Sequence, residues 1–246
     1  SQFECTQPVT LHRSAAWWRT QLAGVQYLLF GKGDASFPPT AAGAFFKSSD
    51  EKVVCDMQIH YVSVAVPDVH GRSDIPTSHG FSSIVYGCRP ESRGYLGLKS
   101  ASPDDAPAIF PNYLTVEQDA IDIRNGFRKT RDIFLRKAFD PYRGEQMKPS
   151  RDVNVDSDDE LGAWIRATGE TLYHPVGTCK MGSDKMAVTN EHGQVQGLEG
   201  LRVVDASLMP TLISGNTNAP TIMMAEKISD HIRGRNFLAP QQIAAE

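Results

Sequence analysis

Residues 172–182 read LYHPVGTCKMG, and residues 203–221 read VVDASLMPTLISGNTNAPT. Pro175 disfavours helical backbone at His174, so the imidazole lies on a stiff, extended segment. Histidine is the side chain that exchanges a proton most readily near neutral pH. The first stretch therefore predicts a turn that presents a histidine. Without further context, a His-Pro pair is most often an ordinary turn histidine.

The second stretch predicts a short strand, a polar turn and a helix. Residues 203–204 are apolar and β-branched, as in a buried strand. Residues 221–232 carry apolar side chains at helical spacing; Pro220 suits the first helical position, and Asn218 or Ala219 would be the cap. A helix start behind a polar turn presents free N–H groups and the positive end of a dipole. It therefore suits an anion, or a ring that gains negative charge during a reaction.

Both stretches resemble the C-terminal half of the glucose-methanol-choline (GMC) oxidoreductase family. The shared motifs are HPVGTCKMG, GLRVVDASLMP and GNTNAPT, with further similarity at residues 87–94 and 111–114. Several long motifs in the right order make the resemblance specific, and it runs from about residue 5 to residue 235. It is strongest toward bacterial members that oxidise choline or aliphatic alcohols. The resemblance implies an FAD-dependent enzyme that oxidises an alcohol.

The resemblance also implies roles for individual residues. It places the hydride acceptor at flavin N5 and assigns His174 as the catalytic base, and a neutral imidazole can take a hydroxyl proton. The second active-site residue of the family, His or Asn, matches Asn216, whose amide can donate to or accept from the substrate hydroxyl. Two residue groups match segments that bind FAD: Asp205 and Ala206 beside the pyrophosphate and ribityl, and Asn218, Pro220 and Thr221 beside the flavin pyrimidine edge.

The predicted elements, together with the resemblance, imply an α+β fold in two parts. Residues 1–170 would form a substrate-binding domain, an antiparallel sheet covered by helices. Residues 171–236 would complete an FAD-binding, Rossmann-like domain and carry the catalytic His and Asn, and residues 237–246 would be a tail. Ser14 would cap the first helix. The patterns predict helices at residues 14–30, 116–137 and 156–168, and strands at residues 44–46, 53–66, 81–88 and 94–99.

The composition is that of a globular protein with a core. The chain has 246 residues, 40% of them hydrophobic, and a net charge of −4, so no basic excess favours nucleic acid. No apolar run approaches the roughly 20 residues that cross a bilayer. The 4 cysteines are scattered without paired metal-ligand spacing, so we expect reduced thiols and no metal site. These features favour a cytoplasmic location, with peripheral attachment to the inner membrane as the alternative.

The sequence contains no Gly-x-Gly-x-x-Gly turn, which would hold the dinucleotide in a protein of this family. Alone, the chain is expected to hold FAD poorly, because the adenine and pyrophosphate would lack their main site. We therefore expect an N-terminal FAD-binding half as a partner. That half would be either a separate chain or the other fragment of a cleaved one.

The expected substrate is a small neutral primary alcohol. Choline-oxidising members of the family carry a Glu-x-Gly-x-Phe segment whose Glu faces the trimethylammonium group, and the matching residues 41–45 here read AAGAF. A methyl side chain cannot offset the desolvation of a quaternary cation, although aromatic faces could compensate in part. The candidate walls of the substrate cavity are Phe45, His60, Tyr61, Tyr86 and Tyr173.

Other functions remain open. Choline dehydrogenase activity is the first, and FAD-containing hydroxynitrile lyases share the fold. A light-driven fatty-acid decarboxylase also shares it, but lacks the motif that residues 174–177 supply. A non-catalytic subunit would explain the missing nucleotide-binding turn, although the presence of both His174 and Asn216 argues against it. The electron acceptor is open among oxygen, a quinone or another acceptor.

Overall fold

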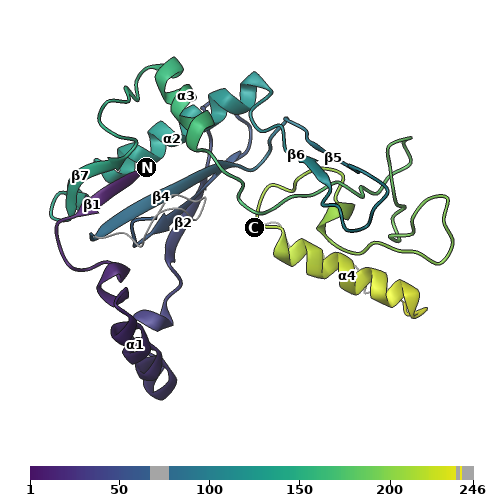
Figure 1. Ribbon diagram of the computed structural model, residues 1–246, viewed down its shortest axis with the longest axis horizontal. Coiled ribbons are helices and arrows are strands. Elements are labelled where there is room, and N and C mark those ends of the chain that lie inside the picture. The colour runs from purple at the N-terminus through teal and green to yellow at the C-terminus, as the bar shows by residue number, and fades with distance from the viewer. Residues whose placement is uncertain (67–77, 237–238, 240–246) are drawn as a thin grey trace. The chain divides into compact units, whose positions relative to one another are not determined.

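The computed structural model describes residues 1–66, 78–236 and 239, which form two compact units (Figure 1). Unit 1 consists of Ser1–Ser92 and Asn112–Leu172. Unit 2 consists of Arg93–Pro111 and the chain from Tyr173 onward. Residues 93–111 thus cluster with the C-terminal part of the chain, whereas the sequence placed them in a substrate domain ending at residue 170. Apart from Ala239, the predicted tail lies outside the described residues.

Unit 1 is built on a five-stranded antiparallel sheet. Its strands, in spatial order, are β2 (Thr40–Phe46), β3 (Met57–Val62), β4 (Gly80–Gly87), β1 (Gln2–Cys5) and β7 (Arg143–Lys148). The first strand of the chain therefore lies inside the sheet, between β4 and the edge strand β7. The predicted mixture of helices and antiparallel strands is confirmed.

Helix α2 (Glu117–Phe134) covers one face of this sheet, and α3 (Asp158–Thr168) packs against α2 (Figure 1). A Cβ added at Gly126 of α2 would lie 2.4 Å from Cε of Met57 on β3, so helix and sheet approach closely at that glycine. Two core clusters result. The first cluster is Phe3, Cys5, Phe81 and Phe134. The second cluster is Phe127, Val155, Leu161 and Ile165.

Helix α1 (Trp17–Phe30) begins three residues later than predicted. Ser14 does not cap it: Ser14 ends a 3₁₀ turn, η1 (Leu11–Ser14), and its hydroxyl donates to the Asp34 carboxylate in η2 (Asp34–Ser36). Figure 1 shows α1 standing away from the sheet, and none of its residues is buried. Its exposed large apolar side chains are Trp17, Trp18, Leu22, Val25, Tyr27, Leu28, Leu29 and Phe30.

Unit 2 contains little regular structure. Its elements are a two-stranded sheet of β5 (Tyr95–Gly97) and β6 (Ala108–Phe110), the 3₁₀ turn η4 (Ala206–Leu208) and helix α4 (Asn218–Ile232). The short strand expected at residues 203–204 does not form, and the adjacent Arg202 makes only an isolated bridge with Gln194. Within its described part, unit 2 has no parallel sheet, so the expected completion of a Rossmann-like domain stays a prediction.

Unit 1 also contains the 3₁₀ turn η3 (Lys137–Phe139). The strand predicted over residues 53–66 is shorter than expected and begins only at Met57. No helix among the described residues is both long and apolar enough to cross a membrane.

Candidate active site

His174 lies on a loop whose backbone is held in an uncommon shape. The residue before it, Tyr173, has a φ of +63°, and Gly177 has a φ of +88°. A tyrosine in the left-handed region costs free energy that surrounding contacts must offset, and such residues cluster at functional sites. Between them, Pro175 restricts His174 to extended backbone. The loop therefore restrains the backbone that carries the imidazole.

The downstream end of this loop is tied to the second motif. The backbone N–H of Cys179 donates to the carbonyl of Ser207 at 3.1 Å, and that of Met181 donates to the carbonyl of Leu208 at 2.9 Å. Leu208 is fully buried, so the anchor is part of the core of unit 2. The two stretches of sequence, residues 172–182 and 203–221, are thus joined by main-chain hydrogen bonds.

Asp205 is exposed and shapes η4. Its carboxylate Oδ1 accepts hydrogen bonds from the backbone N–H of Ser207 at 2.8 Å and from the Ser207 hydroxyl at 2.5 Å. This is an N-cap interaction, which satisfies a donor at the start of the turn. Ala206, the first residue of η4, is partly buried. The structure gives these two residues a local structural role, and their contact with FAD stays a prediction.

Helix α4 begins at Asn218, with Thr217 as its N-cap residue. Neither Asn218 nor Ala219 is the cap, and Pro220 occupies the third helical position rather than the first. The earlier start follows from the backbone of Thr217, whose φ of −82° and ψ of −15° are already helical. Asn218 is exposed, while Pro220 and Thr221 are partly buried.

Thr217 is the residue that meets His174. Its Oγ1 lies 2.5 Å from Nδ1 of His174, and Thr217 is only 8% exposed. Sequence reasoning missed Thr217: the N-cap preference of threonine marks a residue at the start of a helix, but it does not indicate a contact with His174. Asn216, the second predicted catalytic residue, is exposed and directly precedes Thr217. The loop of His174 and the turn of Asn216 are thus brought together within unit 2.

The predicted cavity walls divide between the two units. On the sheet of unit 1, Nε2 of His60 lies 2.9 Å from the Tyr86 hydroxyl and 3.2 Å from Nε2 of Gln58. Phe45 is paired with Gln58 on the neighbouring strand, so its side chain lies on the same face of the sheet. Tyr61 points to the opposite face and packs against the first core cluster. Tyr173 belongs to unit 2 and is 69% exposed. Tyr61 therefore does not share a wall with His60.

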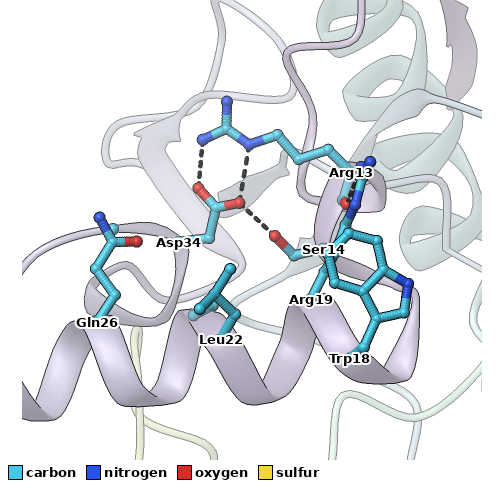
Figure 2. A pocket seen from close by; sticks show the side chains of 9 residues that line it. Arg13, Ser14, Trp18, Arg19, Leu22, Gln26 and Asp34 are labelled. Atoms are coloured by element: carbon cyan, nitrogen blue, oxygen red, sulfur yellow. Dashed lines mark hydrogen bonds and ion pairs between the residues drawn. The ribbon is translucent and has the colours of Figure 1, made fainter.

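A separate hollow of about 380 Å³ lies in unit 1, between α1 and the turns that flank it. Figure 2 shows the Arg13 guanidinium facing the Asp34 carboxylate, with the Ser14 hydroxyl on its other side. The hydrogen bond from Arg13, followed by that from Ser14, lowers the pKa of Asp34 to about 2. Since Arg13 already neutralises that carboxylate and His174 lies in the other unit, this hollow is not the candidate active site.

The four cysteines are free thiols. Cys5 and Cys88 are buried and Cys55 is exposed. Burial, followed by the nearby Asp56 carboxylate, raises the pKa of the Cys88 thiol to about 11. No group of three or more His, Cys, Asp or Glu side chains within the described ranges is arranged to hold a metal ion.

Comparisons with known proteins cover most of this chain. Residues 90–225 match a family profile described as GMC oxidoreductase. A protein named oxygen-dependent choline dehydrogenase from Pseudomonas aeruginosa (strain UCBPP-PA14) is 45% identical over 237 residues, which are 96% of this chain and 42% of that protein. A protein of the same name from Yersinia pseudotuberculosis serotype IB (strain PB1/+) is 44% identical over 243 residues, 99% of this chain and 42% of that protein.

Solved structures share the fold at low sequence identity. A formate oxidase superimposes with a TM-score of 0.83 at 18% identity, over 95% of this chain and 45% of that one. A pyridoxine 4-oxidase from Mesorbium loti gives a TM-score of 0.76 at 21% identity, over 96% of this chain and 42% of that one. The chain spans about two fifths of the length of the curated relatives that it matches.

Proposed function

Because the chain belongs to the GMC oxidoreductase family, we propose that it forms the catalytic C-terminal part of an FAD-dependent enzyme that oxidises a primary alcohol to the aldehyde. The observation that supports this function best is the hydrogen-bonded placement of His174. A strained loop presents the imidazole, and a buried hydroxyl holds one of its two ring nitrogens. Such an arrangement suits a side chain that must accept a proton from a fixed direction.

In this function His174 is the general base. It takes the hydroxyl proton of the alcohol, and an orienting partner on Nδ1 keeps the ring from turning as the proton arrives. Asn216 sits on the turn beside this pair and is the second catalytic residue in the proposal. Its amide donates to the substrate oxygen, or accepts from it, without competing for the proton.

The start of α4 provides groups that suit FAD. Its first turn carries no acidic side chain, and Thr217 makes no side-chain cap hydrogen bond there among the residues that the structure describes. The helix start therefore presents the backbone N–H groups of Asn218 and Ala219 and the positive end of the helix dipole. No carboxylate in the first turn would repel an anion bound there. We assign Asn218, Pro220 and Thr221 to the pyrimidine edge of the flavin. When bound, FAD supplies the acceptor for the two electrons and the carbinol hydrogen.

The proposed FAD site also includes the segment that turns at η4. Asp205 and Ala206 would lie near the pyrophosphate through their backbone, because the Asp205 carboxylate is occupied by Ser207. A neutralised or hydrogen-bonded carboxylate opposes a phosphate less than a free one does. The main dinucleotide site belongs to the partner half described below.

For the substrate, the proposal is a small neutral primary alcohol. The segment AAGAF at residues 41–45 carries no charge that would face a quaternary ammonium group. Choline is the second candidate, because the relatives reported above are named choline dehydrogenases. Comparing kcat/KM for choline with that for aliphatic and benzylic alcohols decides between them, and a preference for choline would overturn the first choice.

The proposal includes a partner that carries the dinucleotide-binding half. The relatives are more than twice as long as the segment that this chain matches, and the sequence lacks the Gly-x-Gly-x-x-Gly turn. The apolar surface of α1 supports the same proposal, because eight large apolar side chains on one helix are exposed in this chain. Intact-mass analysis of the purified yellow enzyme tests it, and a lone colourless 246-residue polypeptide with full activity would contradict it.

The electron acceptor and the location complete the proposal. Oxygen, a quinone or another acceptor would reoxidise the flavin, and measuring peroxide against artificial acceptors separates an oxidase from a dehydrogenase. The proposed location is the cytoplasm, with peripheral attachment to the inner membrane as the alternative. Cell fractionation under low and high salt distinguishes the two.

The central experiment is anaerobic reduction of the enzyme-bound flavin. Mixing the yellow enzyme with excess primary alcohol should bleach its visible absorbance in a single turnover. A hydroxynitrile lyase would keep its colour under the same conditions, since its reaction involves no net redox change. Absence of bleaching with every alcohol would therefore remove the proposed function.

A further inference from the structure

The contact between Thr217 and His174 has consequences for which ring nitrogen can react. Oγ1 of Thr217 and Nδ1 of His174 are 2.5 Å apart, well within hydrogen-bonding distance. We propose that Thr217 is a positioning residue, which accepts the Nδ1–H of His174 and thereby keeps Nε2 as the nitrogen that takes the substrate proton. This inference rests on the proposed function of His174 as a base.

The hydroxyl of Thr217 is available because of how α4 begins. An N-cap threonine normally turns its hydroxyl toward the backbone N–H two or three residues on. Here Thr217 has helical backbone and makes no such bond within the described part of the chain, so its side chain is directed to the imidazole instead. The helix gives up a cap interaction, which indicates that the hydroxyl serves the histidine.

Thr217 is itself held firmly. Its carbonyl accepts two hydrogen bonds from Thr221, one from the backbone N–H at 3.0 Å and one from the hydroxyl at 2.7 Å. The residue is 8% exposed, so water competes little for its hydroxyl. On the other side, the positive φ of Tyr173 fixes the backbone that carries the ring. The imidazole is therefore fixed by its own loop and, at Nδ1, by a helix start.

The direction of the hydrogen bond follows from the chemistry required of a base. If Nδ1–H donates to Thr217, Nε2 carries a lone pair, and the same hydrogen bond persists after Nε2 takes up a proton. If the Thr217 hydroxyl donated to Nδ1, the neutral ring would carry its proton on Nε2 and could accept none there. Only the first arrangement is compatible with a base that works through Nε2 and never needs to exchange tautomers.

Three variants of the complete flavin-bearing enzyme test this role. Thr217→Val keeps the side-chain shape and removes the hydroxyl, whereas Thr217→Ser keeps the hydroxyl and removes a methyl group. Thr168→Val is the matched control, since the exposed Thr168 donates its hydroxyl to the Trp164 carbonyl within α3. We expect Thr217→Val to slow anaerobic flavin reduction by about 10- to 100-fold, the range for a slightly misplaced catalytic group. Thr217→Ser should retain most of the rate, and Thr168→Val all of it.

A second measurement reads the tautomer without any turnover. In protein labelled with ¹⁵N in its histidine rings, the ring shifts distinguish a protonated from an unprotonated nitrogen, and the His174→Gln variant assigns the His174 signals. The proposal expects the neutral ring to be protonated at Nδ1 in the wild type and to become a mixture of tautomers in Thr217→Val.

The two measurements separate failure of this inference from failure of the function. A wild-type ring protonated at Nε2, or a Thr217→Val enzyme with unchanged rate and tautomer, would overturn the positioning role even if the enzyme oxidises alcohols. A wild-type enzyme that shows the Nδ1–H tautomer but never reduces its flavin would instead contradict the proposed function. If Thr217→Val and Thr217→Ser lost the rate equally while Thr168→Val did not, the hydroxyl would be excluded as the cause.

Discussion

His174 and Thr217 lie 43 positions apart in the chain, yet Nδ1 of the first is 2.5 Å from Oγ1 of the second. The loop of His174 supplies the ring and the start of α4 supplies its hydrogen-bond partner. Main-chain hydrogen bonds join the loop to η4, which precedes α4 in the chain, and all three segments belong to unit 2. The proposed reactive imidazole and its orienting hydroxyl thus come from two separate sequence motifs, and neither motif alone indicates their contact.

The first prediction concerns His174 itself. His174→Gln keeps a polar side chain but removes the group that accepts a proton, so flavin reduction by alcohol should slow by at least about 100-fold. The thermal stability should change little, because His174 is only partly buried. His231→Gln is the control: His231 is stacked on His192 at the other end of α4 and should leave the rate unchanged. Near-normal reduction in His174→Gln would remove the assigned role.

The second prediction compares two helical glycines. A Cβ at Gly24 of α1 meets no atom within 4 Å, so Gly24→Ala should stabilise the protein by about 0.5–1 kcal/mol through helix propensity. A Cβ at Gly126 of α2 would lie 2.4 Å from Cε of the fully buried Met57. Gly126→Ala should therefore destabilise by about 1–3 kcal/mol despite the same propensity gain. Urea unfolding of both variants checks this, and equal shifts in the two would contradict the close packing of α2 on β3.

The third prediction concerns pH. The pKa of Asp34 is lowered to about 2 by Arg13 and Ser14, so this carboxylate stabilises the fold above its unfolded pKa of about 4. That contribution should decline as the pH falls below about 4 and should be lost as the pH falls through about 2. Because the Arg13 side chain is 51% exposed, solvent screens the pair, and Asp34→Asn should cost about 0.5–1 kcal/mol near pH 6.

Unfolding free energies of the wild type and of Asp34→Asn should therefore converge at low pH. Asp104→Asn, at an exposed position in unit 2, serves as the control and should match the wild type throughout. A difference between wild type and Asp34→Asn that is undiminished at pH 2 would show that the carboxylate is not responsible.

Parts of the fold follow directly from sequence patterns, and the reasons for the misses are physical. Helices over residues 116–137 and 156–168 were predictable, since a long apolar stripe determines α2 and an acidic first turn capped by Ser157 determines α3. The start of α1 was not, because Asp34, twenty positions away, takes the hydroxyl of Ser14. Strand β7 reads RGEQMK and has no apolar alternation; its pairing with β1 forms it.

In the candidate site, too, some residues could be predicted from the sequence and others depend on tertiary contacts. His174 and Asn216 were identified from motifs, and the structure places their segments together. Thr217 was missed because its role depends on a tertiary contact that neither its spacing nor its residue type reveals. Tyr61 was grouped with His60 although adjacent residues in a strand point to opposite faces, a consequence of strand geometry that the sequence already contained.

The fourth prediction concerns the thiols. Cys55 is exposed, whereas Cys88 is buried and its pKa is raised to about 11, so about one Cys88 thiol in a thousand is ionised at pH 8. In the native protein a thiol reagent should modify Cys55 quickly and leave Cys88 unmodified until the protein unfolds. Cys55→Ser should remove the fast phase and Cys88→Ser should not. Rapid native modification of Cys88, located by peptide mass analysis, would contradict its burial.

The fifth prediction concerns α1. Leu28 is 83% exposed and Leu29 69% exposed, so the double change Leu28→Glu and Leu29→Glu removes no contact from the core of this chain. The fold should therefore survive, with an unchanged far-ultraviolet circular dichroism spectrum. If the partner half covers α1, burying two carboxylates in that interface is costly, and the variant should lose the partner and its flavin on gel filtration.

The double change Val53→Glu and Val54→Glu provides the matched control. Both valines are exposed and lie in unit 1 outside α1, so this variant introduces the same two negative charges on the same unit. It should keep both partner and flavin. If the α1 variant retains the partner but no longer floats with anionic vesicles that the wild type binds, α1 contacts a membrane surface and the proposed interface is wrong. If it keeps the partner and neither protein binds vesicles, the apolar face of α1 takes no part in assembly.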